Sequence, residues 1–534
     1  MRRTLWFLST LVIASSMFVV ACSAPTPQVV EKVVEKIVEK QVVQIVQVTA
    51  VPTVAPKPGR GITVVQGPEP LSLDPSVDIG KTSINVQQTI LDPLVNHMSD
   101  NETIPWLATE WKAVAPTRWR IKLREGVTFH NGEPFNADSV VFSINTYNSS
   151  KGEGSKMFKY VKEAVAVDEY TVDIVTEKPN PFVPESLAFL HALPPKYYAK
   201  MGPEQFSQAP VGTGPFTFEE WQYGVQIVVR ANPKYWGGAP ALASVTFKPA
   251  KEASTRVAML ETGEADIISN VPPELVDRVN GAGSTVIREV PSLRMIFLEF
   301  NPFEPPFDDV RVRKAFNYAI DKASLIDDVL GGHASPMKGV NIPGWLGYKP
   351  GDLTDYPYDP KKAKALLAEA GYGDGLTVDF WYPIGRYLKD KESAEAIAGQ
   401  LREVGVTLNM NGSDINTLVQ RIHTQKLSGL HFFSMAPLIM DPDYLFRTHF
   451  YSKGLNQYGW TERTDKDIEA ASSILVRVQR EAIYSKLDAY LTNEHVPWVY
   501  MYLQNLIYGV NNSLDWQPRP DEIIDLRTAK FKTE

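Results

Sequence analysis

The sequence predicts a fold that contains both helices and strands, of the α/β or mixed α+β class. Its several sheets are divided between two or three domains. About 470 residues follow residue 60, and a chain of this length exceeds what one hydrophobic core usually serves. Residues 118–123 (RWRIKL) alternate polar and apolar side chains as a half-buried strand does. Amphipathic helical runs, such as residues 361–370, lie between segments of this kind. Short strands and helices that alternate along one long chain indicate this fold class.

The other elements follow from local signals. Residues 62–65 (ITVV) are β-branched and predict the first strand, and residues 376–381 (LTVDFW) predict a later one. Caps and periodicity predict three helices. These cover residues 137–144 with Asn136 as the N-cap, residues 361–370 between Pro360 and Gly371, and residues 393–404.

The first residues have the pattern of an export signal. A short basic start is followed by an apolar run that ends at Ala21, and residues 1–21 are therefore interpreted as a signal peptide. The next residue is Cys22, the single cysteine of the chain. Residues 19–22 (VVAC) resemble the bacterial lipobox, which implies cleavage before Cys22 and a lipid on its sulfur. The alternative is a plain secretory signal with an incidental cysteine.

Residues 22–60 are predicted to be a linker between the lipid and the folded part. Residues 29–48 repeat a VVEK-like tetrad, and the four-residue period drifts around a helix instead of keeping one face. A coiled coil requires a seven-residue repeat. We interpret the segment as a tether, with an oligomerisation helix as the alternative.

The sequence gives no pattern typical of a catalytic or metal centre. Neither an H-E-x-x-H pair nor a G-x-S-x-G elbow occurs, and the phosphate-loop position before Gly80-Lys81-Thr82 holds Pro75 where a glycine is required. The pair Asp441 and Asp443 flanks a proline, which favours a turn. The net charge of −8 gives no basic footprint for nucleic acid. We therefore predict no enzyme, no cofactor and no metal, with an exported hydrolase as the rival class.

Four groups of motifs closely resemble the solute-binding proteins of peptide-type and nickel-type ABC importers, known as solute-binding family 5. They occur in the order typical of the family, and the resemblance extends from about residue 61 to the C-terminus. The motifs are WLATEW (106–111) with RWRIKLREGVTFHNGEPF (118–135) and ADSVVF (137–142); PVGTGPF (210–216) with NPKYWG (232–237); LETGEADI (260–267); and FNP (300–302) with PPFDDVRVRKAF (305–316) and AID (319–321).

Most motif residues have a structural interpretation and do not name a ligand. We expect the tryptophans to be core anchors and the glycines to adopt backbone conformations that a Cβ would forbid. Asp308 and Asp309 are expected to begin a helix. These tryptophans and glycines are Trp106, Trp119, Trp236, Gly126, Gly132, Gly212 and Gly214.

The resemblance implies a periplasmic-binding-protein-like fold with two lobes, a hinge and an extra domain. The hinge would include strands near residues 292–300 and 496–502, and the ligand would be enclosed by closure of the lobes. The implied division is lobe I at 61–100, 208–290 and 497–534, the extra domain at 101–207, and lobe II at 291–496.

The resemblance also implies the function and the partners. The protein would be a monomer at the outer face of the cytoplasmic membrane or in the periplasm. It would bind a solute of the oligopeptide class and deliver it to the permease and ATPase of an ABC importer. A surface adhesin or signalling receptor on the same fold would bind its ligand without those partners.

Peptide binders of the family carry a segment of the form W-x-x-D-x-x-D-P-D, whose first Asp pairs with the peptide amine. The matching residues here are 435–443 (MAPLIMDPD), which place Met435 at the Trp position and Leu438 at the Asp position. Loss of one member of a buried ion pair typically costs about 3–5 kcal/mol. The amine site is therefore either rearranged or unused.

An unused amine site would fit a neutral ligand, such as an oligosaccharide or a capped peptide. Sugar sites favour aromatic platforms, and a nickel chelate is a weaker third possibility. Candidate aromatic residues of the second lobe are Trp345, Trp381, Tyr382, Tyr387, Trp460 and Trp498.

Arg386 is the candidate that could receive a carboxylate bidentately, although a solvated loop arginine is an equal alternative. The complete set of predicted ligand contacts is Ser72, Leu73, Asp74, Tyr382, Arg386, Met435, Ala436, Pro437, Leu438, Trp460 and Trp498.

Overall fold

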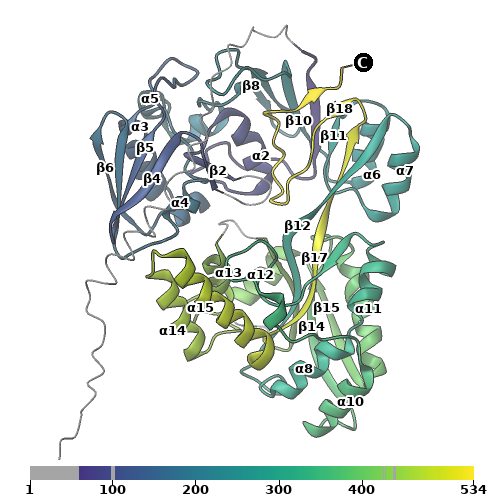
Figure 1. Cartoon of the computed structure of the whole chain (residues 1–534). Helices are drawn as coiled ribbons and strands as arrows, with labels where there is room; N and C mark the ends of the chain where they lie inside the picture. The colour runs from purple at the N-terminus through teal and green to yellow at the C-terminus, as the bar shows by residue number, and fades with distance from the viewer. Residues whose placement is uncertain (1–58, 98–102, 425, 427, 437–440, 534) are drawn as a thin grey trace, which may run out of the picture. The chain divides into compact units, whose positions relative to one another are not determined.

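The computed structural model describes residues 59–97, 103–424, 426, 428–436 and 441–533 (Figure 1). Residues from Ala55 onward form one compact unit. The predicted signal peptide, Cys22 and nearly all of the predicted linker lie outside the described residues. No helix among the described residues combines the length and the apolar character that crossing a bilayer requires.

An eleven-stranded sheet runs through the molecule in the order β15-β14-β16-β12-β17-β11-β1-β10-β9-β8, and β13 pairs with β17. We call the part around β1 and β8–β11 the first lobe, and the part around β13–β16 the second lobe. The strands are β1 (Ile62–Gln66), β8 (Phe216–Gln222), β9 (Gln226–Ala231), β10 (Ser244–Pro249), β11 (Ile267–Ile268), β12 (Thr285–Phe300), β13 (Ala334–Pro336), β14 (Leu376–Pro383), β15 (Val406–Ser413), β16 (Leu430–Met435) and β17 (Trp498–Asn511).

Two long antiparallel strands, β12 and β17, connect the lobes and lie side by side in Figure 1. One end of the pair, from Thr285 opposite Asn511, adjoins β11; the other, near Glu299 opposite Trp498, adjoins β16. The register is interrupted between Pro291 and Met295. The interruption lies where the pair passes from one lobe to the other.

The second lobe has its own hydrophobic core, with members between Leu293 and Leu503. The helix predicted between Pro360 and Gly371 is confirmed as α10, and the Asp359 carboxylate caps it by accepting from Lys362 N at 2.9 Å. The helices are α8 (Val310–Ala319), α9 (Lys322–Ser324), α10 (Pro360–Glu369), α11 (Asp390–Glu403), α12 (Ile415–His423), α13 (Pro442–His449), α14 (Glu462–Ser472) and α15 (Arg477–Tyr490).

A second core joins the first lobe to a four-stranded sheet of order β4-β5-β7-β6, which we call the four-stranded unit together with α3–α5. The predicted cap at Asn136 is confirmed as a capping box with Ser139. Its strands and helices, with those of the first lobe, are β2 (Val95–His97), β3 (Thr103–Pro105), β4 (Ala108–Ala115), β5 (Arg118–Leu123), β6 (Val161–Asp168), β7 (Thr171–Thr176), β18 (Leu514–Asp515), β19 (Lys530–Phe531), α2 (Lys81–Ile90), α3 (Ala137–Ser149), α4 (Val183–Ser186), α5 (Pro195–Gln208), α6 (Ala253–Glu261) and α7 (Val276–Gly281).

The motif glycines serve two different purposes. Gly126 and Gly132 have φ of 75° and 87°, as a conformational requirement predicts. Gly212 and Gly214 instead lie against the end of α2, where a Cβ on Gly212 would come within 2.1 Å of the Ile90 carbonyl oxygen. The prediction of a special backbone conformation was therefore wrong for Gly212 and Gly214, whose requirement is close approach.

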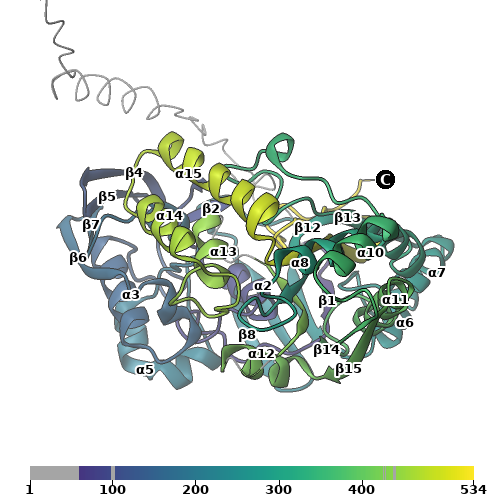
Figure 2. The same cartoon turned by 90° about the horizontal axis from the view of Figure 1, so that it is seen from below.

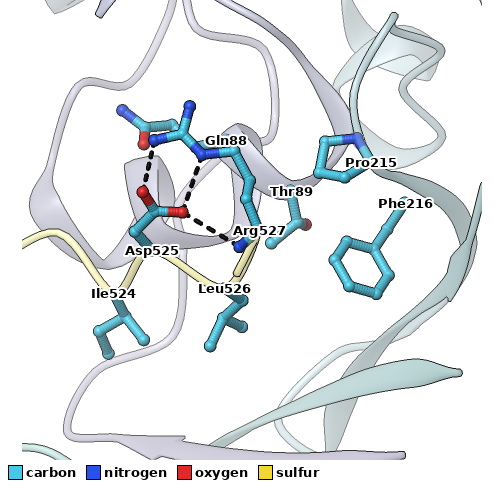
Figure 3. A pocket seen from close by; sticks show the side chains of 8 residues that line it. All are labelled: Gln88, Thr89, Pro215, Phe216, Ile524, Asp525, Leu526 and Arg527. Atoms are coloured by element: carbon cyan, nitrogen blue, oxygen red, sulfur yellow. Dashed lines mark hydrogen bonds and ion pairs between the residues drawn. The ribbon is translucent and has the colours of Figure 1, made fainter. Parts of the chain in front are cut away.

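The C-terminal segment packs against α2 in the first lobe (Figure 3). Ile524 N donates to the side chain of Asn85 at 2.9 Å. The Arg527 guanidinium pairs with the Asp525 carboxylate, with Nε at 2.8 Å from Oδ1. The cavity beside this pair measures about 10 Å³, the space of a single water. The segment is thus fixed by packing, and the adjoining cavity is too small for a solute.

Candidate functional site

The candidate ligand site lies where β14 and β16 end in the second lobe. These strands are parallel, with Phe380 opposite Leu430, so their carboxyl ends lie at one edge of the sheet. Open α/β sheets bind ligands beyond the carboxyl ends of their strands. Tyr382 lies at the end of β14, and Met435 is the last residue of β16. The structure thus brings these predicted residues to a common edge.

The loop after β14 is fixed by a buried carboxylate. Asp390 accepts from the backbone nitrogens of Gly385, Arg386 and Tyr387 at 3.0, 2.7 and 2.9 Å. The Arg386 side chain is exposed, with its guanidinium carbon 5.7 Å from the centre of the Tyr387 ring. A rigid loop therefore presents a cation that lacks full charge compensation.

Arg294 lies on the crossover strand β12 and connects the two lobes. Its Nε and Nη2 donate to Glu522 Oε1 at 3.1 and 2.7 Å, and its Nη1 donates to Ser434 Oγ at 3.1 Å. Burial acts to raise the pKa of Glu522, but Arg294 and Lys81 outweigh it and the pKa is lowered. Arg294 thus connects Glu522, in the C-terminal segment of the first lobe, to Ser434 near the end of β16.

The predicted first-lobe contacts belong to the framework of a loop. Leu73 is a fully buried core residue. The Ser72 hydroxyl accepts from Asp74 N at 3.0 Å, and Asp74 accepts from Ser76 N at 2.8 Å and from the Tyr198 hydroxyl at 2.6 Å. Burial raises the pKa of Asp74. These side chains hold the loop, and the structure does not present them to solvent.

Two predicted aromatic contacts lie away from this edge. Trp498 is fully buried in the second-lobe core, stacked on Phe297 with ring centres 3.7 Å apart. Trp460 packs beside Phe303, with ring centres 5.9 Å apart, just beyond the end of β12. Ala436 is half-buried next to Met435. Pro437 and Leu438 lie outside the described residues, so the assignment of the amine position stays a prediction.

Sequence reasoning missed the charged residues Arg294, Glu522 and Lys81. They come from three segments far apart in the chain, and no motif connects them. One signal was available, because Arg294 is a charged residue at the start of the apolar run 295–298. A lone charge at such a place in a crossover strand indicates a partner across the strand.

Across the described ranges, no three His, Cys, Asp or Glu side chains are grouped as metal ligands.

A groove of about 640 Å³ lies between the four-stranded unit and helices α13 and α14 of the second lobe. Figure 2 shows these two helices beside the four-stranded unit. Next to it, the Arg480 guanidinium lies 4.7 Å from the centre of the Phe182 ring. Glu185 also lies at this contact, and its Oε2 is buried without a hydrogen-bond partner in the described part of the chain. The contact therefore contains an arginine stacked on an aromatic ring and a carboxyl oxygen that is shielded from solvent.

We expect Glu185→Gln to gain stability relative to the wild type as pH rises from 5 to 8. Burial, and then the charge of Asp441, raise the pKa of Glu185 to about 7, while Arg480 and Arg477 oppose the shift. Between about pH 4.5 and pH 7 the folded protein keeps a proton on Glu185 that the unfolded chain has lost. The free energy of unfolding of the wild type therefore falls as pH rises through this range. Urea denaturation at both pH values measures the difference, with Glu163→Gln at an exposed position as the control. A difference that does not change with pH contradicts the prediction.

Comparisons with known proteins agree on one family. Residues 102–457 match the model of the bacterial extracellular solute-binding proteins, family 5. The dipeptide-binding protein of Escherichia coli is 33% identical over 59% of this chain and 65% of its own. The glutathione-binding protein GsiB of Pectobacterium atrosepticum is 27% identical over 86% of this chain and 91% of its own. The structure of HbpA2 from Haemophilus parasuis, 25% identical, superposes with a TM-score of 0.79 over 89% of this chain and all of that one.

Proposed function

The chain belongs to the bacterial extracellular solute-binding proteins of family 5, and on that premise we propose that it is a lipid-anchored receptor for oligopeptide-class solutes. Proteins of this family are substrate-binding components of ABC importers and not enzymes. In the proposal, Cys22 carries the lipid, the solute binds between the lobes outside the cytoplasm, and the closed form delivers it to the permease and ATPase. The relatives that bind dipeptides and glutathione support this substrate class.

We assign lobe I to residues 61–100, 208–290 and 497–534, the extra domain to 101–207, and lobe II to 291–496. The interrupted register between Pro291 and Met295 supports a hinge near the start of the second lobe. A solute drives closure only through contacts that it makes better in the closed state.

The exposed side chain of Arg386 is the observation that supports a peptide-class solute. In the described part of the chain, no carboxylate lies within ion-pair distance of its exposed guanidinium, although the loop that holds it is fixed by Asp390. A guanidinium presented in this way fits the planar carboxylate at the end of a peptide, or an acidic side chain. In the proposal, this site therefore binds an acidic group of the solute.

The oligosaccharide alternative receives less support from the second lobe. Of the aromatic residues that could form sugar platforms, four are at most 9% exposed and belong to the core: Trp345, Tyr382, Tyr387 and Trp498. The face of Trp381 is covered by the Arg421 guanidinium at 4.6 Å. The binding test described below therefore includes an oligosaccharide.

We expect Arg386→Gln to weaken peptide binding by at least about thirtyfold, because a charge-assisted bidentate contact contributes about 2–3 kcal/mol. Calorimetry and thermal shift of the full-length protein in detergent measure this with a mixed tripeptide pool. A pool with amidated C-termini should lose binding in the wild type, and an N-acetylated pool should keep it.

Lys391→Gln is the matched control, because Lys391 is an exposed neighbour that pairs with Glu395 at 3.8 Å. A peptide at about 100 times its dissociation constant should add about 2.7 kcal/mol of stability. Binding of maltotriose without binding of any peptide pool would overturn the proposed substrate class.

A further inference from the structure

A small pocket with several polar and charged residues in its lining opens in the first lobe near the Arg294–Glu522 pair, and no part of the proposed function uses it. Its volume of about 30 Å³ holds two or three water-sized atoms, which is the size of a carboxylate group. It lies between the start of α2, the end of β2 and the C-terminal segment. The polar and charged residues that line it are Lys81, Gln88, Asn96, His97, His191, Arg519 and Asp521.

The charges around this pocket do not balance. Arg519 forms a fork with Asp521, with distances of 3.0 and 2.6 Å. Lys81 has no carboxylate within 4.0 Å among the described residues. Desolvation lowers the pKa of Lys81, and the more distant charges of Asp521 and Glu522 offset only part of this. The pocket therefore contains one ammonium group that an anion would stabilise.

His97 gives a second and independent indication of a ligand. Its side chain is 6% exposed and lines the pocket, and its buried Nε2 has no hydrogen-bond partner in the described residues. Nδ1 lies 3.3 Å from the Thr103 hydroxyl. Burial lowers the pKa of His97 to about 4, so the ring is neutral at pH 7. When Nδ1 accepts from Thr103, the proton is on Nε2, and this N–H is left without an acceptor among the described residues.

We propose that this pocket binds a carboxylate of the solute, through Lys81 and His97, and that the solute therefore carries two acidic groups. One acid binds Arg386 of the second lobe, and the other enters the first-lobe pocket. The inference rests on the proposed function and deepens it by naming the substrate class. A solute held at both places contacts both lobes at once, so it binds the closed form better than the open form.

The pocket is tested alone with formate, which is small enough to fill it. Formate at 100 mM should raise the melting temperature of the full-length protein by about 1–2 °C over equal chloride or formamide. The rise should be lost in Lys81→Met, and it should be kept in Lys81→Arg, in Arg386→Gln and in the exposed control Lys251→Met. If the pocket holds only water, formate will not raise the melting temperature. An equal rise in Lys81→Met would mean that formate binds elsewhere. Either result overturns the inference.

The substrate class is tested with tripeptides that carry one Glu at each position in turn, against the matching Gln peptides. At least one Glu peptide should bind about tenfold more tightly than its Gln partner, and Lys81→Met should remove that difference. Equal binding of every pair overturns the inference while the peptide proposal stands. A formate effect at Lys81 without binding of any peptide supports the pocket and overturns the peptide proposal instead.

Discussion

Replacing Asp92 by alanine is expected to cost about 4 kcal/mol or more of folding stability. Asp92 is 1% exposed and accepts four hydrogen bonds from side chains. Its Oδ1 accepts from Trp106 Nε1 at 2.8 Å and from the Tyr235 hydroxyl at 3.0 Å. Its Oδ2 accepts from the Thr213 hydroxyl and from Trp236 Nε1, both at 2.9 Å. Each buried donor left without an acceptor costs about 1–3 kcal/mol.

Asp92→Asn should give an intermediate loss, because the amide has one acceptor oxygen for four donors. Urea denaturation followed by tryptophan fluorescence measures both variants. Asp374→Ala, at an exposed loop position, is the control and should stay within about 0.5 kcal/mol of the wild type. A stability of Asp92→Ala equal to that of this control would contradict the prediction.

Local elements were predictable because their signals are local. The predicted strand over residues 118–123 is β5, and the caps at Asn136 and Asp309 are where the sequence indicates. The local hydrogen bond predicted for Asp441 and Asp443 is present, since the Asp441 carboxylate accepts from Asp443 N at 3.0 Å, but it caps the start of α13 and does not form the predicted turn. Such features depend on residues within four positions of one another.

The candidate site was predictable only in part, because it depends on which distant segments meet. The resemblance pointed to the segment that begins at Met435, the last residue of β16, and the guanidinium of Arg386 made its loop a candidate. It could not place Trp498, whose pattern of neighbours suits a core strand and a ligand platform equally. Arg294, Glu522 and Lys81 meet through the crossover strand and the C-terminal segment. Their sequence separations, up to 441 positions, leave no local pattern to recognise.

Removing Asp441 is expected to destabilise the protein by about 3–5 kcal/mol, the second of the two largest effects. Asp441 and Arg480 form an ion pair in which both side chains are 5% exposed. Burial acts to lower the pKa of Arg480, but the charge of Asp441 outweighs it and the pKa is raised. Asp441→Ala leaves a buried cation over the Phe182 ring, and breaking such a pair costs far more than an exposed pair contributes.

The loss has two parts, because Asp441 is also the N-cap of α13. Asp441→Asn keeps an acceptor for Asp443 N and should cost less than Asp441→Ala by about 1 kcal/mol. The double variant Asp441→Ala/Arg480→Met removes both charges, and it should be more stable than Asp441→Ala alone because no buried cation is left unpaired. Urea denaturation of the four proteins completes the cycle. Strict additivity of the Asp441→Ala and Arg480→Met losses would mean that the two side chains do not interact, and the large cost would then belong to the cap and to packing against Phe182.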